Sequence, residues 1–280
     1  MGFDSQFIAG ILVPLPTLSD RIRIDAFDEG RPIEHTRFSI VFHERRGLAI
    51  FTAHNIDGQT MLPSNTIPRK DRFRFDVSIP RQIQIDNDQG YYKNPYDRGH
   101  LVRRVALHWG DPDEARQADA ESYYWTNIAP QHERLHDTAW GNIEDWMLAL
   151  SNDRAKRACV FTGPVLTSDD REIVNRPGER PFQLPAGFWK VLAVKHNDAL
   201  CAAAFIVWQR DFDVVNPVQF DSVLEQVRIS TVEVLTGLSF DTLRHADPLH
   251  FQAADGSPEA MPFAVSGTPI RNVEDVVLVC

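Results

Sequence analysis

The pattern of apolar and polar positions predicts a β-hairpin early in the chain and a group of strands later. Residues 38–42 (FSIVF) and 48–53 (LAIFTA) are β-rich runs joined by a polar turn that ends in Gly47. Such runs on either side of a glycine-containing turn are typical of antiparallel pairs. Residues 158–166 and the two halves of 188–208 predict three more strands, with the last two paired around residues 196–199 (HNDA).

Helical periodicity follows Pro130 and recurs near the end of the chain. An amphipathic helix is predicted from about His136 to Ser151, because apolar side chains recur at helical spacing. They are Leu135, Ala139, Ile143, Met147 and Leu150. Residues 220–238 (FDSVLEQVRISTVEVLTGL) also predict a helix, with Gly237 as its C-cap.

These elements predict a single α+β domain, since the chain has no internal repeat and no linker-like tract. We divide it into an N-terminal arm (1–36), a core (37–244) and a C-terminal extension (245–280). The apolar run 7–16 is too short for a membrane span and lacks the basic residues that begin a signal peptide. We therefore expect a cytoplasmic protein that does not bind membranes.

The charge distribution changes this picture locally. The chain carries a net charge of −10, which argues against a surface that binds polyanions everywhere. Residues 69–104 nevertheless contain nine Lys and Arg against five Asp, or 9 − 5 = +4. This contrast predicts a local anion-binding groove, although the same charges could be solvated and paired with their aspartates.

The basic segment leads into residues 97–100 (DRGH), at the predicted start of an apolar strand. Hydrolysis of a phosphodiester needs a base with a pKa near neutrality, positive groups for the transition-state charge, and usually a metal ion. Arg98 and His100 supply a cation and a base within one tetrapeptide.

Several motifs in order resemble the DNA/RNA non-specific endonucleases of the ββα-metal class, which include mitochondrial endonuclease G. After DRGH come TNIAPQ (126–131) and AWGNIE (139–144); RKDRFRFDVSI (69–79) precedes them, and FTGPVL (161–166), FWKVLAV (188–194) and VEVLTGLSF (232–240) follow. The resemblance covers roughly residues 37–243. It implies a ββα-metal nuclease fold, with a central, mainly antiparallel sheet flanked by helices.

The resemblance also implies roles for individual residues. His100 matches the general base, and Arg98 and Arg69 match phosphate-binding groups. Asn127 matches an active-site asparagine that positions His100 or the substrate. Glu144 matches a glutamate that holds the water shell of the metal. Four neighbouring arginines complete the expected substrate-binding set: Arg72, Arg74, Arg103 and Arg104.

One position departs from the family pattern. Eight residues before the glutamate the family usually has an asparagine that binds Mg²⁺ directly, whereas this chain has His136. Imidazole suits Mn²⁺ and other transition ions better than Mg²⁺. We expect one divalent ion, Mg²⁺ or Mn²⁺, bound by His136. Glu144 would act through water, because eight helical residues span roughly 12 Å.

Two other functions compete with the nuclease. Residues 132–136 (HERLH) fit the zinc-protease pattern HExxH, but Pro130 places His132 at or before the start of the predicted helix. The substitution at His136 also leaves open a nuclease-like protein that binds nucleic acid or a partner without cutting.

The expected partner is DNA, RNA or both. The resemblance also implies that the chain forms a homodimer. The absence of a secretion signal suggests a gating or inhibitor protein that restrains the enzyme inside its host.

Overall fold

The computed structural model describes residues 1–136, 139–153, 156–196, 198–209, 224–251 and 267–278. An eight-stranded sheet runs through the molecule in the order β14-β12-β11-β10-β7-β4-β3-β2, and all its strand pairs are antiparallel. Its strands are β2 (Ile33–His35), β3 (Phe38–His43), β4 (Leu48–Asp57), β7 (Arg157–Val165), β10 (Gly187–His196), β11 (Ala199–Trp208), β12 (Leu224–Val227) and β14 (Thr268–Ile270).

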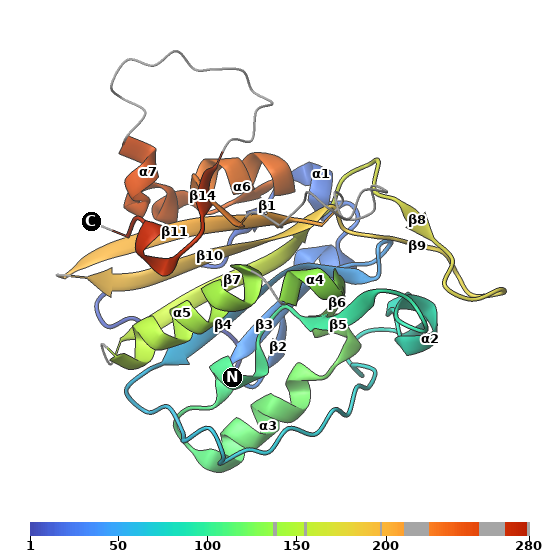
Figure 1. The fold of residues 1–280 in the computed structure, drawn as a ribbon, viewed down its shortest axis with the longest axis horizontal. Helices are drawn as coiled ribbons and strands as arrows, with labels where there is room; N and C mark the ends of the chain where they lie inside the picture. The colour runs from blue at the N-terminus through green and yellow to red at the C-terminus, as the bar shows by residue number, and fades with distance from the viewer. Residues whose placement is uncertain (137–138, 154–155, 197, 210–223, 252–266, 279–280) are drawn as a thin grey trace.

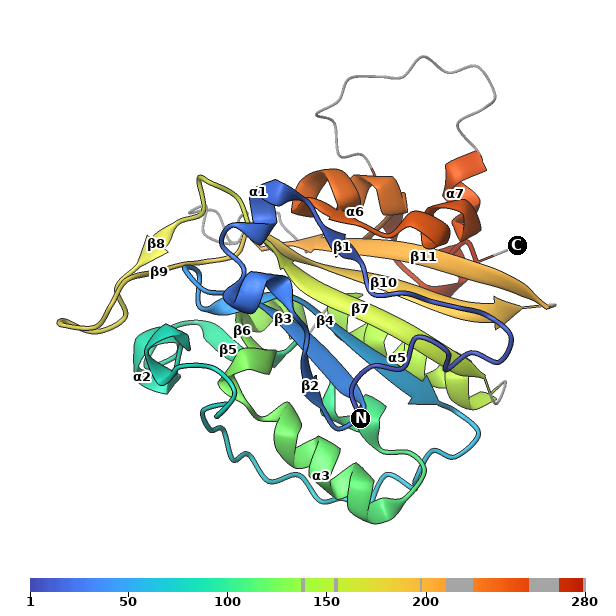
Figure 2. The ribbon, with the colours of Figure 1, turned by 180° about the vertical axis from the view of Figure 1, so that it is seen from behind.

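Both faces of this sheet are covered (Figures 1 and 2). One apolar cluster joins the sheet to α5 through Ile143 and Met147, and the other joins it to the N-terminal arm and α6 through Phe7 and Val232. A strand buried on both faces is apolar at successive positions, which explains the long hydrophobic runs of β10 and β11. The helices are α1 (Asp20–Arg23), α2 (Asn87–Gly90), α3 (Pro112–Ser122), α4 (Glu133–His136), α5 (Ala139–Asp153), α6 (Ile229–Thr236) and α7 (Pro248–Phe251).

A separate pair of strands, β5 (Tyr96–His100) and β6 (Ile128–His132), precedes α4 and α5 and forms a ββα unit with them. Two more small pairs, β1 (Thr17–Leu18) with β13 (Leu238–Ser239) and β8 (Glu172–Ile173) with β9 (Phe182–Gln183), lie outside the large sheet.

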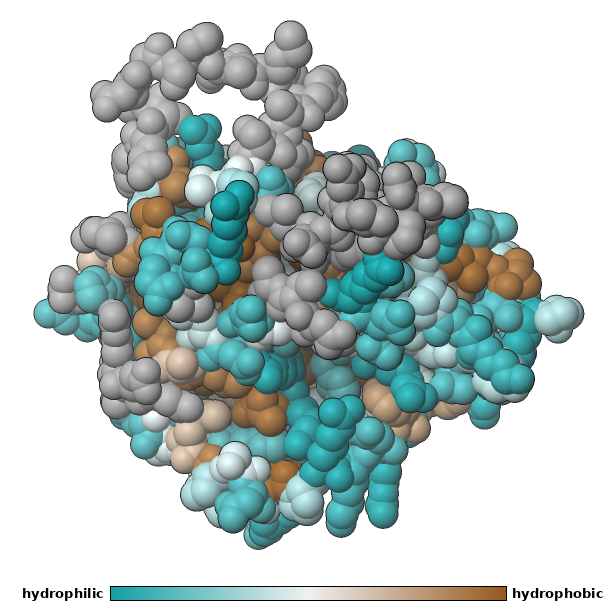
Figure 3. Space-filling model, in the orientation of Figure 1, coloured by the Kyte–Doolittle hydropathy of each residue, from teal (hydrophilic) through white to brown (hydrophobic). Residues whose placement is uncertain are grey.

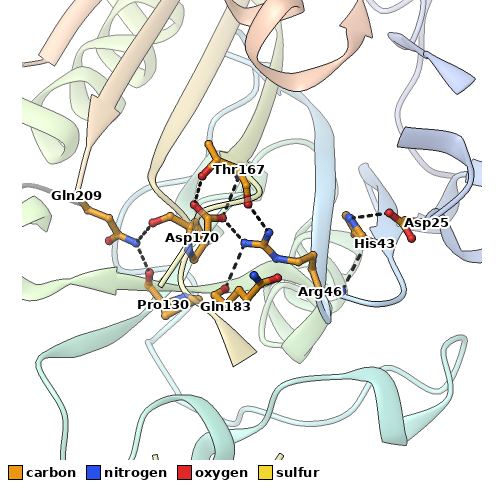
Figure 4. Close-up of polar contacts among 9 residues, drawn as sticks. Asp25, His43, Arg46, Pro130, Thr167, Asp170, Gln183 and Gln209 are labelled. Carbon is orange, nitrogen blue, oxygen red and sulfur yellow. Dashed lines mark hydrogen bonds and ion pairs between the residues drawn. The ribbon is translucent and has the colours of Figure 1, made fainter. Parts of the chain in front are cut away.

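The buried Gln209, directly after β11, fastens β6 to the large sheet (Figure 4). Its side-chain amide donates to the carbonyls of Pro130 (3.1 Å) and Pro185 (2.8 Å), and its Oε1 accepts from the backbone N–H of His132 (3.0 Å). Nearby, the buried ion pair between Arg46 and Asp170 holds the β3–β4 turn against the segment that follows β7. The ββα unit is therefore fixed to the sheet by polar contacts as well as by packing.

The α+β prediction is confirmed, as are the hairpin, the three later strands and the C-cap at Gly237, which has φ 73°. The N-terminal arm packs on the sheet, with Ile8 and Val13 buried. Within the described ranges, no helix combines the length and apolar content of a membrane span.

Three element predictions were wrong in part. The helix expected at 220–238 is confined to α6, because Leu224–Val227 pairs with β11 and β14 as a strand; residues 220–223 lie outside the described ranges. The helix expected from His136 is divided into α4 and α5. His100 ends a strand instead of beginning one, because Leu101 N donates to the carbonyl of Asn127 (2.9 Å) and the chain leaves β5 into a 3-10 turn at Arg104–Leu107.

Candidate active site

The imidazole of His100 lies in an aromatic enclosure at the end of β5. Its ring centroid is 5.9 Å from that of Phe73 and 5.1 Å from that of Tyr123, which it meets edge-on. Nε2 is buried and has no hydrogen-bond partner in the described part of the chain. Burial lowers the pKa of His100 from 6.5 to about 4, and the positive charges of Arg69 and Arg104 act in the same direction. The ring is therefore neutral at pH 7 and able to accept a proton.

That pKa corrects the expectation of a value near neutrality. The enclosure removes water from the imidazolium, and two cations oppose its charge more strongly than Asp71 and Asp119 support it. A phosphate bound beside the ring would raise this pKa toward neutrality, because an opposite charge favours the protonated form.

The sequence around His100 fixes the position of its backbone. His100 pairs with Ile128, and Gly99 pairs with Ala129. A Cβ on Gly99 would lie 2.2 Å from the side chain of Gln131, so the position accepts only glycine while that side chain stays in place. The glycine of DRGH thus lets β5 approach β6 closely.

Asn127 holds the segment that follows His100. Its Oδ1 accepts from Val102 N (2.9 Å), and its Nδ2 donates to the carbonyls of Val102 (3.1 Å) and Ser122 (2.9 Å). The side chain is fully buried. All these contacts are with the backbone, which favours the expected positioning role over a contact with substrate.

Replacement of Asn127 by alanine is expected to destabilise the fold by roughly 2–4 kcal/mol, because buried backbone groups of Val102 and Ser122 lose their partners. Urea unfolding measures the change. Asn142→Ala on the exposed face of α5 is the matched control and should stay within about 0.5 kcal/mol of the wild type. Equal stability of Asn127→Ala and the wild type would contradict the role.

Two expected phosphate-binding arginines flank the same enclosure. The exposed guanidinium of Arg98 lies 5.1 Å from the ring centroid of Phe73 and donates to Asn87 Oδ1 (3.0 Å). Arg69 is also exposed, and its Nε donates to Asp71 Oδ1 (2.7 Å), which also accepts from the hydroxyl of Tyr123 (3.2 Å). Phe73 and Tyr123 thus join His100, Arg98 and Arg69 into one site.

The other four arginines differ in whether their guanidinium groups are free to bind substrate. Arg72 is exposed, and the exposed Arg74 lies over the ring of Tyr124 (4.6 Å). Arg103 contacts the carboxylates of Asp145 (2.6 Å) and Glu144 (3.9 Å). Arg104 donates to Asp119 Oδ1 (2.6 Å), and this ion pair holds it inside the fold, away from a bound phosphate. Hydrophilic residues cover much of the surface over β5, β6 and the segment before α2 (Figure 3).

Glu144 belongs to α5, and its side chain is 11% exposed. Its Oε1 lies 2.9 Å from the Nζ of Lys190, a residue of β10 that is itself buried. The two carboxylate oxygens are thus held between a cation of the sheet and Arg103.

Comparison with known proteins supports the pattern of these motifs. The family model described as DNA/RNA non-specific endonuclease matches residues 21–246, more than half of the chain. The chain belongs to this family. A protein of Sinorhizobium fredii named "Uncharacterized protein y4fB" is 33% identical over 75% of this chain and 33% of its own length. Human mitochondrial endonuclease G is 28% identical over 60% of this chain and 55% of its own length. The Serratia marcescens nuclease is 32% identical over 51% of this chain and 49% of its own length.

The chain thus spans from a third to about half of the length of these relatives. A chain in the crystal structure of the EndoG/EndoGI complex matches the fold with a TM-score of 0.59 and 18% identity, over 85% of this chain and 91% of that one. The ββα-metal nuclease fold predicted from the sequence is confirmed.

The family implies a divalent metal ion, and the described donors fit one that keeps most of its water. Glu144 offers a carboxylate whose buried Oε1 lies 2.9 Å from Lys190 Nζ and whose Oε2 lies 3.9 Å from Arg103 Nε. Oε2, which has the longer of the two contacts, is the oxygen that can accept from a metal-bound water. No group of three or more His, Cys, Asp or Glu side chains that could enclose an ion occurs in the ranges described. The His136 side chain lies outside the described structure.

The HERLH stretch is divided between two elements. His132 is the last residue of β6, and Glu133 begins the short helix α4. A zinc protease of the HExxH type needs its first histidine and glutamate on one helix. The family match and this division leave the protease pattern without structural support.

Sequence reasoning missed four side chains of the site: Phe73, Tyr123, Asp71 and Lys190. Asp71, Phe73 and Lys190 stand inside motifs of the family pattern, but an acid, an aromatic or a lysine in such a run resembles an ordinary core or surface residue. Tyr123 gave no signal, because its contact with Asp71 (3.2 Å) joins positions 52 residues apart.

Proposed function

We propose that this chain is a metal-dependent, largely sequence-non-specific endonuclease that hydrolyses phosphodiester bonds of DNA and RNA. The observation that carries the proposal is the neutral imidazole of His100, whose Nε2 has no hydrogen-bond partner among the described residues. The ring is enclosed by aromatic side chains and bordered by exposed guanidinium groups. A base that is free at pH 7 and lies beside cations suits the activation of water against a phosphate.

In this mechanism His100 accepts a proton from the attacking water. Because Nε2 is buried, the water meets the other ring nitrogen, Nδ1, and Nε2 keeps the proton of the neutral ring. Arg98 and Arg69 bind the non-bridging oxygens and so position the phosphate. Glu144 and His136 would hold a divalent ion, which supplies charge stabilisation at the leaving 3′ oxygen. The products would carry 5′-phosphates.

These arginines would bind the phosphate backbone of the nucleic acid, which explains the expected lack of sequence preference. Contacts to phosphate carry no base information, and their affinity falls as salt rises. His136 in place of the usual asparagine favours Mn²⁺ or another transition ion over Mg²⁺ as the better cofactor.

The test compares the wild type with His100→Ala and Glu133→Ala on plasmid DNA, RNA and casein, with Mn²⁺ and with EDTA. We expect Glu133→Ala to cut nucleic acid like the wild type, His100→Ala to cut about 10²–10⁴-fold more slowly, and EDTA to reduce cutting to background. Digestion of casein that depends on Glu133 would support the protease instead, and binding of DNA without cutting would support a non-catalytic protein.

The pH profile of cleavage follows from the state of His100. Since the neutral ring is the active form, kcat/KM should fall only as pH drops toward about 4. Arg69→Gln removes a cation that opposes protonation, so it should move this acid limb to higher pH. Arg72→Gln, in the same exposed segment, is the control. An acid limb near pH 6.5 in the wild type, or one unmoved by Arg69→Gln, would contradict this arrangement.

Partners beyond the substrate are also proposals. The EndoG/EndoGI structure concerns the inhibition of EndoG, and an inhibitor or gating protein would solve the problem of a nuclease expressed among its host's own nucleic acids. A homodimer and a cytoplasmic location stay predictions from the sequence.

A further inference from the structure

Lys190 is a charged residue in an otherwise apolar row of β10. Phe188, Leu192 and Val194 alternate with it and belong to the cluster that packs against α5, whereas Val191 belongs to the cluster on the opposite face. The Lys190 side chain is 2% exposed. Burial lowers its pKa, and the carboxylate of Glu144 acts in the opposite direction.

The ammonium group has three defined contacts. Nζ lies 2.9 Å from Glu144 Oε1, donates to Thr162 Oγ1 (3.1 Å), and stands 4.7 Å from the ring centroid of Trp140. The carboxylate of Glu144 is the negative charge paired with this ammonium group. His54, which lines the same small cavity, is held neutral because burial and the charge of Lys190 lower its pKa to about 3.

Stability alone does not account for this pair. Burial of two charges costs desolvation, and well-packed apolar residues of similar volume usually stabilise a fold as well or better. The pair does, however, fix a carboxylate. Glu144 Oε2 lies 3.9 Å from Arg103 Nε, and Arg103 stands three residues after His100. Lys190 is therefore joined through Glu144 to the segment that follows His100.

We propose that Lys190 is a positioning residue that holds the Glu144 carboxylate in place to accept hydrogen bonds from the water shell of a divalent ion. This rests on the role proposed for Glu144. It adds a residue from the central sheet to a site otherwise built from the ββα unit and the segment before it.

The test uses Lys190→Met, which keeps an apolar side chain of similar length and removes the charge. We expect the Mn²⁺ concentration for half-maximal cleavage to rise about 10–100-fold, as is typical when a group behind a metal site is lost. The shift of the melting temperature with Mn²⁺ should need correspondingly more ion, and this readout does not depend on cleavage. Val191→Ala, on the opposite face of β10, should lower stability and leave the Mn²⁺ midpoint unchanged.

The double variant Lys190→Met/Glu144→Gln separates positioning from a structural role. If Lys190 acts through Glu144, the double variant loses no more Mn²⁺ affinity than Glu144→Gln alone. Additive losses, or an unchanged midpoint in Lys190→Met, would overturn the proposal.

Thr162→Val supplies a milder test should Lys190→Met not fold. It removes one partner of Nζ and should raise the Mn²⁺ midpoint a few-fold; no rise would count against the proposal.

A wild type that binds Mn²⁺ with a rise in melting temperature but does not cut nucleic acid would refute the proposed function and leave this inference testable by melting alone.

Discussion

Replacement of His100 by alanine is expected to lower kcat for plasmid cleavage by about 10²–10⁴-fold, the usual contribution of a general base. KM should change little, because Arg98 and Arg69 stay exposed at the site. The fold should persist, since Nε2 makes no hydrogen bond among the described residues and its loss leaves no new unpaired group behind.

The matched control is His196→Ala, which removes a histidine at the β10–β11 turn that contacts Lys156 (3.1 Å). It should cut like the wild type. Circular dichroism of both variants excludes unfolding as the cause. A His100→Ala protein that is folded and retains more than a tenth of wild-type kcat would show that another group activates the water.

Removal of divalent ions with EDTA is expected to reduce cleavage to background, and addition of Mn²⁺ should restore it. The reason is the charge that develops on the leaving oxygen, which Arg98 and Arg69 at the non-bridging oxygens do not neutralise. Rates across Mg²⁺, Mn²⁺, Co²⁺ and Zn²⁺ give the order of preference, and Ca²⁺, which takes more ligands in a larger shell, serves as a hard-ion control.

His136→Asn tests the identity of the ion within the same assay. The amide oxygen is a harder ligand than imidazole, so the variant should gain activity in Mg²⁺ relative to Mn²⁺. Equal Mg²⁺ dependence in both proteins would end the idea that His136 binds the metal. Leu135→Met, which changes the buried neighbour on α4 while preserving its apolar character, controls for a disturbed helix.

The elements that the sequence predicted well are those with a local signal. The runs at 38–53 and 188–208 are apolar on both sides of tight turns, and both are hairpins of the large sheet. Residues 224–227 were placed in a helix because they adjoin a helical pattern, but a free edge of β11 pairs with them. Edge pairing of this kind depends on what lies beside the segment in space, which periodicity does not report.

The candidate site shows the same contrast between residues with a local sequence signal and contacts that only the fold creates. Family motifs predicted His100, Asn127 and Glu144 as site residues, and Asn127 binds the backbone of Val102, two residues after His100. Burial depresses the pKa of His100, and the charges of Arg69 and Arg104 add to the effect. The rings of Phe73 and Tyr123 that pack around His100 come from positions at least 23 residues away in the sequence, so local patterns do not report them. The ion pair between Glu144 of α5 and Lys190 of β10 is likewise a contact between distant segments that the sequence pattern does not report.

The most direct test of the nuclease assignment is incubation of the purified wild-type chain with supercoiled plasmid DNA and Mn²⁺, followed by gel electrophoresis and mapping of the fragment ends. We predict conversion through nicked and linear forms to short fragments with 5′-phosphates at many unrelated sequences. Plasmid that stays intact in every divalent ion, while a mobility shift shows that the chain has bound it, would contradict the assignment.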